Sequence, residues 1–205
     1  HGVRRILEVP WAYSFFQKSI QRKSIWADIF EREIFLDVNS LSILDIGCGP
    51  GNLLAEQGMK IDQSKFVGID PSQDYVDHAT ELFPAARFHS GTVKSVDLTE
   101  ETFDLIVISG VLHHVDDEEA QEIMRFSHAH KTNKGLIVSL DPVFFPGQNV
   151  FARWMALADR GQNVRTVESL EGLWRGALAS SDIQISIKSG YLRVPHDYVL
   201  CKVSS

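Results

Sequence analysis

The sequence has few cysteines, no long apolar run and no excess of basic residues. Only Cys48 and Cys201 occur among 205 residues, which argues against a disulfide framework and favours reduced thiols in the cytoplasm. No run reaches the roughly 18 apolar residues of a membrane-spanning helix, and the first residues lack a signal-peptide core. The net charge of −7 argues against nucleic acid as a partner, because phosphate binding needs a basic face.

Repeats, low-complexity segments and Pro/Gly/Ser-rich linkers are also missing, which favours one domain over residues 1–205. The histidines lack the spacing to cysteines or acids that a metal site requires, so no metal is predicted. Nothing in the sequence indicates an oligomeric state.

What is present is an alternation of strand and helix patterns. Strands are predicted at 42–46, 65–70, 86–90, 103–109, 135–141, 183–189 and 197–203. Helices are predicted within 10–37, at 52–58 and 72–82, from Asp116 onward, and at 148–158 and 167–179. This order predicts an α/β fold, a mostly parallel seven-stranded sheet with helices on both faces. The last two strands are expected to form an antiparallel hairpin, Ser72 to cap its helix, and Pro142 to stop the fifth strand.

The most specific feature is a glycine-rich turn between the first strand and its helix. Gly47, Gly49 and Gly51 let the backbone turn sharply and approach a ligand closely. Asp70 follows Gly51 by 19 residues, where the next parallel strand ends. A carboxylate there can accept hydrogen bonds from both hydroxyls of a ribose. The spacing therefore predicts a nucleoside-binding site.

Two cofactor classes use such a turn, and the spacing separates them. A dinucleotide site has the pattern Gly-x-Gly-x-x-Gly, whereas here the third glycine comes one residue early. From Asp45 the pattern is Asp-x-Gly-x-Gly-x-Gly, which resembles the first motif of class I S-adenosylmethionine (SAM) methyltransferases. The resemblance covers residues 41–141, including Phe103–Val107 and Val111–Val115. It implies a Rossmann-like fold, SAM as cofactor and S-adenosylhomocysteine as product.

The resemblance also implies which residues hold the cofactor. They are Asp45, Gly47, Cys48, Gly49, Gly51, Asp70, Pro71, Ser72, Thr92, Val93, Ser109, Gly110, Val111 and His114. Carbonyls of Ser109 and Gly110 would face the methionine ammonium, and residues after Gly91 would flank the adenine. Thr92 departs from the family pattern, which usually has an acid there, so its hydroxyl would accept from the adenine more weakly.

Outside this core the chain resembles a bacterial methyltransferase group that accompanies polysaccharide and O-antigen biosynthesis. The resemblance rests on 11–17, Asp141-Pro142 with Gly147-Gln148, 159–165 and 194–198. It divides the domain into an N-terminal helical lid (1–40), a SAM-binding core (41–141), a substrate-cover segment (142–180) and a C-terminal hairpin (181–205).

Methyl transfer to a hydroxyl or amine often needs a base, and histidine suits that role near neutral pH. His114 is the first candidate, because its position resembles the base of some sugar N-methyltransferases and phosphoethanolamine methyltransferases. His113 is the second candidate, and packing in the cofactor pocket is the alternative for both. Tyr13 is either a partner of this base within the lid or an ordinary amphipathic-helix residue.

Four residues are candidates for the acceptor substrate: Asp141, Gln148, Arg160 and Arg165. The two arginines could clamp a phosphate or carboxylate, and a solvated loop is the alternative. The predicted function is a cytoplasmic SAM-dependent methyltransferase acting on a small molecule, sugar-linked or anionic, at a hydroxyl or amine. The alternatives are a methyltransferase for a quinone or polyketide, a non-catalytic SAM-binding protein, and an NAD-dependent oxidoreductase, which the glycine spacing disfavours.

Overall fold

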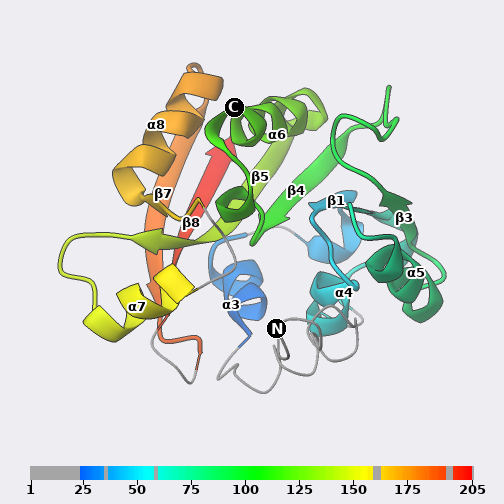
Figure 1. Cartoon of the computed structure of the whole chain (residues 1–205). Helices are drawn as coiled ribbons and strands as arrows, with labels where there is room; N and C mark the ends of the chain where they lie inside the picture. Colours follow the sequence, from blue (N-terminus) through cyan, green and yellow to red (C-terminus); the bar gives the residue numbers. More distant parts are fainter. Residues whose placement is uncertain (1–23, 35–36, 58–59, 159–162, 193–195, 205) are drawn as a thin grey trace. The chain divides into compact units, whose positions relative to one another are not determined.

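The computed structural model describes residues 24–34, 37–57, 60–158, 163–192 and 196–204 (Figure 1). The chain forms two compact units that meet in the sequence between Asp97 and Leu98. The first predicted helix, with Trp11 and Tyr13, lies outside the described residues. The proposed division into lid, core, cover and hairpin stays a prediction.

The first unit contains a parallel sheet in the order β3-β2-β1. Its elements are α3 (Ile25–Arg32), η1 (Val38–Ser40), β1 (Ile43–Ile46), α4 (Asn52–Gln57), η3 (Gln63–Lys65), β2 (Phe66–Asp70), α5 (Gln73–Leu82) and β3 (Arg87–Ser90). Every residue of β1 and β2 is buried, as in a parallel strand covered on both faces. The strands β1 and β2 pair in register from Ile43 and Phe66, so the glycine turn and Asp70 follow adjacent strand ends.

Side-chain caps fix where the helices of this unit begin. Ser24 accepts a hydrogen bond from the Ala27 N–H at the start of α3, and Ser72 accepts one from Tyr75 at the start of α5. Ser72 is the cap that the sequence predicted. The cap on α5 matters for the site, because Ser72 comes two residues after the end of β2.

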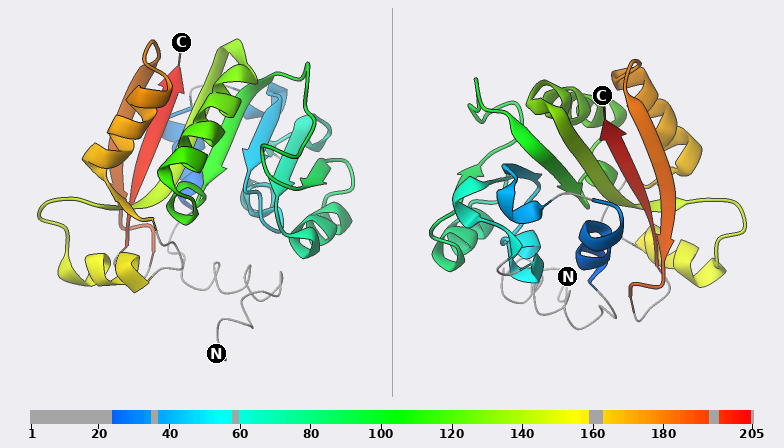
Figure 2. Two further views of the ribbon diagram at one scale, coloured as in Figure 1. Left: turned by 45° about the horizontal axis from the view of Figure 1, so that its top comes forward. Right: turned by 180° about the vertical axis from the view of Figure 1, so that it is seen from behind.

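The second unit contains a mixed sheet in the order β4-β5-β8-β7, with the short strand β6 also beside β5. Its elements are β4 (Phe103–Ser109), η4 (Leu112–His114), α6 (Asp117–Ala129), β5 (Lys131–Phe144), α7 (Val150–Ala158), β6 (Arg165–Thr166), α8 (Val167–Ala177), β7 (Asp182–Ser189) and β8 (Asp197–Ser204). Strands β4, β5 and β6 run parallel, whereas β7 and β8 form the predicted antiparallel pair. Helices α6 and α8 lie side by side on one face of this sheet (Figure 2).

Strand β5 differs from the prediction at both ends. It begins at Lys131 and continues through Pro142 to Phe144, so the expectation that Pro142 stops it was wrong. The last residue pair between β4 and β5 is Ser109 with Leu140. Beyond that pair β4 no longer lies beside β5, so the N–H that proline lacks is not needed there. Pro142 still pairs with Tyr198 of β8.

The sequence also missed β6, because two residues carry no strand pattern. Arg165 pairs with Val143 and Thr166 with Phe144. In the described part of the chain, no helix is both long and apolar enough to cross a membrane.

Candidate functional site

The glycine turn after β1 has a backbone that only glycine adopts easily. Gly49 has φ +54° and Gly51 has φ +82°, both in the left-handed region. A Cβ at Gly49 would meet only Asn52 Nδ2, at 3.7 Å, so the backbone there is bare. A Cβ at Gly51 would lie 2.8 Å from the Phe83 ring. The two glycines therefore serve different purposes, one leaving the backbone accessible and the other allowing the turn to pack on α5.

The N–H groups of this turn already have acceptors within the protein. Gly47 and Cys48 donate to the Ile69 carbonyl (2.8 and 3.0 Å), Gly49 to Asp70 Oδ2 (2.9 Å) and Gly51 to the Cys48 carbonyl (3.1 Å). Proline at position 50 has no N–H. A pyrophosphate needs unpaired backbone donors at such a turn. The four N–H groups of the turn are therefore already paired, which favours a nucleoside cofactor without a pyrophosphate over a dinucleotide.

Asp70, the last residue of β2, has a carboxylate that backbone donors hold in place. Its Oδ2 accepts the Gly49 N–H and its Oδ1 accepts the Ser72 N–H, both at 2.9 Å. Each carboxylate oxygen has two lone pairs, so each can accept one more donor. Two oxygens with one free lone pair each match the paired hydroxyls of a ribose. Burial raises the pKa of Asp70, and these two hydrogen bonds oppose the shift.

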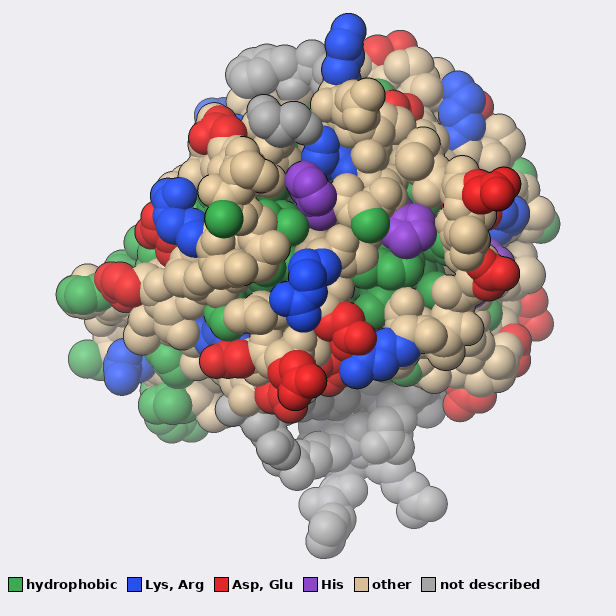
Figure 3. Space-filling model, turned by 90° about the horizontal axis from the view of Figure 1, so that it is seen from above, with side chains coloured by type: hydrophobic (Ala, Val, Ile, Leu, Met, Phe, Trp, Pro, Cys, Tyr) green, Lys and Arg blue, Asp and Glu red, His purple; other side chains and the backbone are tan. Residues whose placement is uncertain are grey.

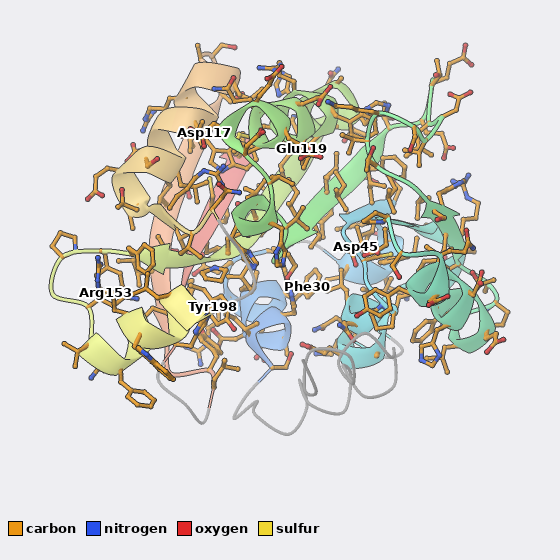
Figure 4. All side chains as sticks on the ribbon, in the orientation of Figure 1. Phe30, Asp45, Asp117, Glu119, Arg153 and Tyr198 are labelled. Atoms are coloured by element: carbon orange, nitrogen blue, oxygen red, sulfur yellow. The ribbon has the colours of Figure 1, made fainter. Side chains whose placement is uncertain are left out.

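Asp45 lies in β1 just before the turn (Figure 4) and is 2% exposed. Burial, and after it the charge of Asp70, raises the pKa of Asp45 to about 8. Asp45 therefore keeps its proton at neutral pH. Burial and the same two acids also raise the pKa of Cys48, so this thiol is not a nucleophile at neutral pH.

The buried proton of Asp45 predicts a pH dependence of stability. The native chain holds this proton up to pH about 8, whereas the unfolded chain releases it near the ordinary value 3.8. Between these values the native state binds more protons, so the free energy of unfolding falls as pH rises. We expect urea unfolding at pH 5.5 and pH 8 to show this fall in the wild type and a smaller one in Asp45→Asn.

Asp62 is only partly buried and gives a matched control, because hydrogen bonds from Ser64 lower its pKa and keep it ionised throughout this window. Asp62→Asn should keep the wild-type difference between pH 5.5 and pH 8. An equal fall in Asp45→Asn and in the wild type would contradict the assignment of the proton to Asp45.

The residues predicted to flank the adenine follow β3. Gly91 donates to the Asp70 carbonyl at 2.9 Å, so this segment begins beside the predicted ribose acid. The Thr92 N–H donates to Ser95 Oγ at 2.9 Å, which fixes the next turn and leaves the Thr92 side chain exposed. Pro71 is exposed and Val93 is half-buried. The structure thus groups the predicted cofactor residues of the first unit around the ends of β1, β2 and β3.

In the second unit, the segment after β4 carries the other predicted cofactor residues. Ser109, Gly110 and Val111 are each partly exposed. Gly110 has φ +67° and donates to the Leu140 carbonyl at 2.8 Å, which holds this segment against β5. The turn η4 then carries His113 and His114.

His113 is buried, and Asp141 of β5 holds both its ring and its backbone. Asp141 Oδ1 lies 2.9 Å from His113 Nδ1 and accepts the His113 N–H at 3.2 Å. A carboxylate oxygen only accepts, so Nδ1 carries a proton, and in the neutral ring the lone pair is then on Nε2. The other oxygen of Asp141, Oδ2, is buried without a hydrogen-bond partner. An imidazole oriented in this way by a carboxylate has the arrangement of a general base.

His114 has a different environment. It is exposed, and its ring lies 4.0 Å from the His113 ring, measured between centroids. Figure 3 shows histidine side chains at the surface seen from above. The sequence favoured His114 as the base, whereas the carboxylate contact favours His113. The roles of both residues stay predictions.

The predicted substrate residues have separate surroundings. Gln148 Nε2 donates to the Val143 carbonyl (3.0 Å) and to Asp197 Oδ2 (3.1 Å), and its Oε1 is buried without a partner. Arg165 has its guanidinium buried at the turn that carries the histidines. Arg160, like Tyr13, lies outside the described residues.

Within the described ranges, no cluster of His, Cys, Asp or Glu could hold a metal ion.

The chain is similar to known methyltransferases in sequence and in fold. The model of the methyltransferase domain family matches residues 43–135. Across 99% of the chain, the fold superposes with a TM-score of 0.64 on 96% of the plantazolicin methyltransferase BpumL in complex with a pentazolic desmethylPZN analog and S-adenosylhomocysteine, at 17% identity. The chain has the fold of a class I SAM-dependent methyltransferase. The predicted fold class is thereby confirmed.

Two curated relatives show how far the likeness in sequence extends. An uncharacterized methyltransferase of Alkaliphilus oremlandii is 27% identical over 146 residues, which cover 65% of each chain. A ubiquinone biosynthesis O-methyltransferase of Rhodopseudomonas palustris is 34% identical over 117 residues, which cover 54% of this chain and 43% of the relative. The chain thus spans less than two thirds of the length of either relative.

Two features of the second unit escaped the sequence interpretation. The pairing of His113 with Asp141 joins residues 28 positions apart, and no local pattern indicates it. Asn163 was not singled out, although its N–H donates to the His113 carbonyl at 3.0 Å. The only signal that could have linked them is the position of Asp141 near the end of a buried strand beside β4.

Proposed function

We propose that this chain is a SAM-dependent methyltransferase that methylates a hydroxyl or amine of a small molecule, with a sugar or glycan precursor as the favoured acceptor. The observation that carries the proposal is the glycine turn whose donors are internally paired, next to the positioned carboxylate of Asp70. Such a site can accept a ribose, and the N–H groups of its turn are not free to bind a pyrophosphate. The methyltransferase fold supports the same cofactor.

When bound, SAM supplies an electrophilic methyl group on its sulfonium. The protein's own contribution begins with Asp70, which accepts hydrogen bonds from the two ribose hydroxyls. Gly49 and Ser72 keep its carboxylate in the plane that this requires. The bare backbone at Gly49 lets the nucleoside lie close to the turn.

The acceptor must lose a proton when its oxygen or nitrogen is methylated. We assign the removal of this proton to Nε2 of His113. Asp141 holds the ring's own proton on Nδ1 and stabilises the imidazolium that forms when Nε2 takes up the second one. His114 is the second candidate for the base. Gln148 Oε1 and Asp141 Oδ2 are buried oxygens without partners, and each can accept a hydrogen bond from an acceptor hydroxyl.

The sugar assignment rests on the resemblance of the outer segments to methyltransferases of polysaccharide biosynthesis. A quinone is the second candidate acceptor, because a relative 34% identical over 117 residues is named as a ubiquinone biosynthesis O-methyltransferase. The two buried free cysteines, Cys48 and Cys201, suit a reducing compartment such as the cytoplasm.

The test has two stages. Calorimetry with SAM, S-adenosylhomocysteine and NAD should show binding of the first two and none of NAD. Methyl transfer from isotopically labelled SAM is then measured on a panel of nucleotide sugars, glycan fragments and quinone head groups. Binding of NAD in place of SAM would contradict the cofactor assignment. Binding of SAM with no transfer to any member would favour a non-catalytic SAM-binding protein.

A further inference from the structure

The short turn η4, which carries His113 and His114, has no cap of its own. Val111 provides no side-chain hydrogen bond at its start. Carbonyl groups at the end of a helical turn need donors from elsewhere when they are not exposed to water. Within the turn itself, the His114 N–H donates to the Val111 carbonyl.

The missing donors come from Arg165, about 50 residues later in the chain. Arg165 Nη1 donates to the Leu112 carbonyl, at the start of the turn. Arg165 Nη2 donates to the Val115 carbonyl, just after its end, at 2.9 Å. The neighbouring Asn163 N–H donates to the His113 carbonyl at 3.0 Å. Three carbonyls of residues 112–115 thus depend on one short segment.

The guanidinium of Arg165 has five N–H groups, and each has an acceptor here. Besides the two turn carbonyls, Nη1 donates to the Asn163 carbonyl (3.3 Å), and Nε and Nη2 lie 2.9 and 2.8 Å from Asp117 Oδ1. The Arg165 side chain is 8% exposed. No N–H group of Arg165 is left to clamp an anionic substrate.

The segment that carries Arg165 is itself anchored on both sides. Strand β6 pairs it with Val143 and Phe144 of β5, the strand that also carries Asp141. Thr166 caps α8 by accepting a hydrogen bond from the Ser169 N–H. On the other side, the Asp117 carboxylate at the start of α6 (Figure 4) accepts a hydrogen bond from the Arg165 Nε–H. The histidine turn is therefore held by β5 through Asp141 and by β6 through Arg165.

We infer that Arg165 is a positioning residue that holds the turn of His113 in its working geometry, and that it does not bind the acceptor as the sequence predicted. The inference rests on the proposed function for its consequence, which is catalysis by His113. A displacement of a base by about 1 Å can lower a rate about 100-fold. Lysine cannot replace this arginine, because a single ammonium group lacks the forked donors with which the guanidinium reaches both ends of the turn.

The first test measures how well the turn is held in place and does not need enzymatic turnover. In Arg165→Lys we expect amide hydrogen exchange of residues 111–115 to become at least tenfold faster, while exchange in β1 and β2 stays unchanged. The NMR resonances of the His113 ring should shift in the same variant. Arg175→Lys is the matched control, because Arg175 forms an exposed ion pair with Glu171 on α8. Unchanged exchange at 111–115 in Arg165→Lys would overturn the inference.

The second test uses turnover. Arg165→Lys should lower kcat roughly 10-fold and leave the KM of the acceptor nearly unchanged. In a His113→Ala background the same change should have no further effect, because the base that it positions is gone. A raised acceptor KM with unchanged kcat, additive with His113→Ala, would mean that Arg165 binds substrate. If the wild type itself transfers no methyl group, the proposed function fails, and hydrogen exchange still decides the role of Arg165.

Discussion

Replacing His113 by alanine is expected to lower kcat for methyl transfer about 100-fold and to leave the affinity for SAM nearly unchanged. The reason is the contact between His113 Nδ1 and Asp141 Oδ1 at 2.9 Å, which presents Nε2 as the proton acceptor. The affinity should hold because the ribose acid and the glycine turn belong to other segments. Steady-state kinetics at saturating SAM, together with calorimetry, measure the two quantities separately.

His114→Ala is the matched variant, because it removes the same side chain from the neighbouring position. We expect it to lower kcat much less, since His114 is exposed, and the contact to Asp141 belongs to His113. A 100-fold loss in His114→Ala with a small loss in His113→Ala would restore the interpretation that the sequence favoured. Normal turnover in both variants would mean that the two rings only pack.

The second large effect is expected at Asp70. Asp70→Ala should weaken SAM binding by roughly 1–3 kcal/mol, which is about 5- to 150-fold in Kd. The variant removes the acceptor for the ribose hydroxyls and also the bonds that hold Gly49 and Ser72. Calorimetry with S-adenosylhomocysteine gives the same difference without any turnover.

Asp74→Asn provides the control for this measurement. Asp74 is an exposed acid in the first turn of α5, close in sequence to Asp70 and of the same charge. Its replacement should leave the Kd of SAM within about twofold. Equal affinity of the Asp70→Ala variant and the wild type would remove the ribose assignment, and with it the main support for the proposed cofactor site.

Elements with a strong local signal could be predicted from the sequence. Buried β-branched runs such as Phe103–Ser109 mark a strand whatever surrounds them, and the bounds of β4 agree with the prediction. Ser72 could be placed as a helix cap because capping involves residues three positions apart. The glycine turn is equally local, since positive φ at Gly49 and Gly51 is a property of the residues themselves.

What the sequence could not give depends on contacts between distant segments. Pro142 is tolerated in β5 because β4 ends before it, and no pattern near Pro142 reveals where β4 ends. For Arg165 in its polar loop, the sequence left a substrate clamp and a solvated surface as alternatives, because an isolated arginine gives no sign of the carbonyls it meets. Its acceptors at Leu112 and Val115 become visible only when β6 lies beside β5.

The internal pairing of the glycine turn has a consequence for the ligand-free protein. Ile69, Asp70 and Cys48 already accept hydrogen bonds from the turn's backbone donors. The turn therefore reaches its final conformation during folding and does not need a bound ligand to do so. Added nucleoside should then raise the melting temperature only by mass action, by an amount set by its concentration relative to Kd. In the apo protein, the glycine turn should have the same backbone conformation before and after the nucleoside binds.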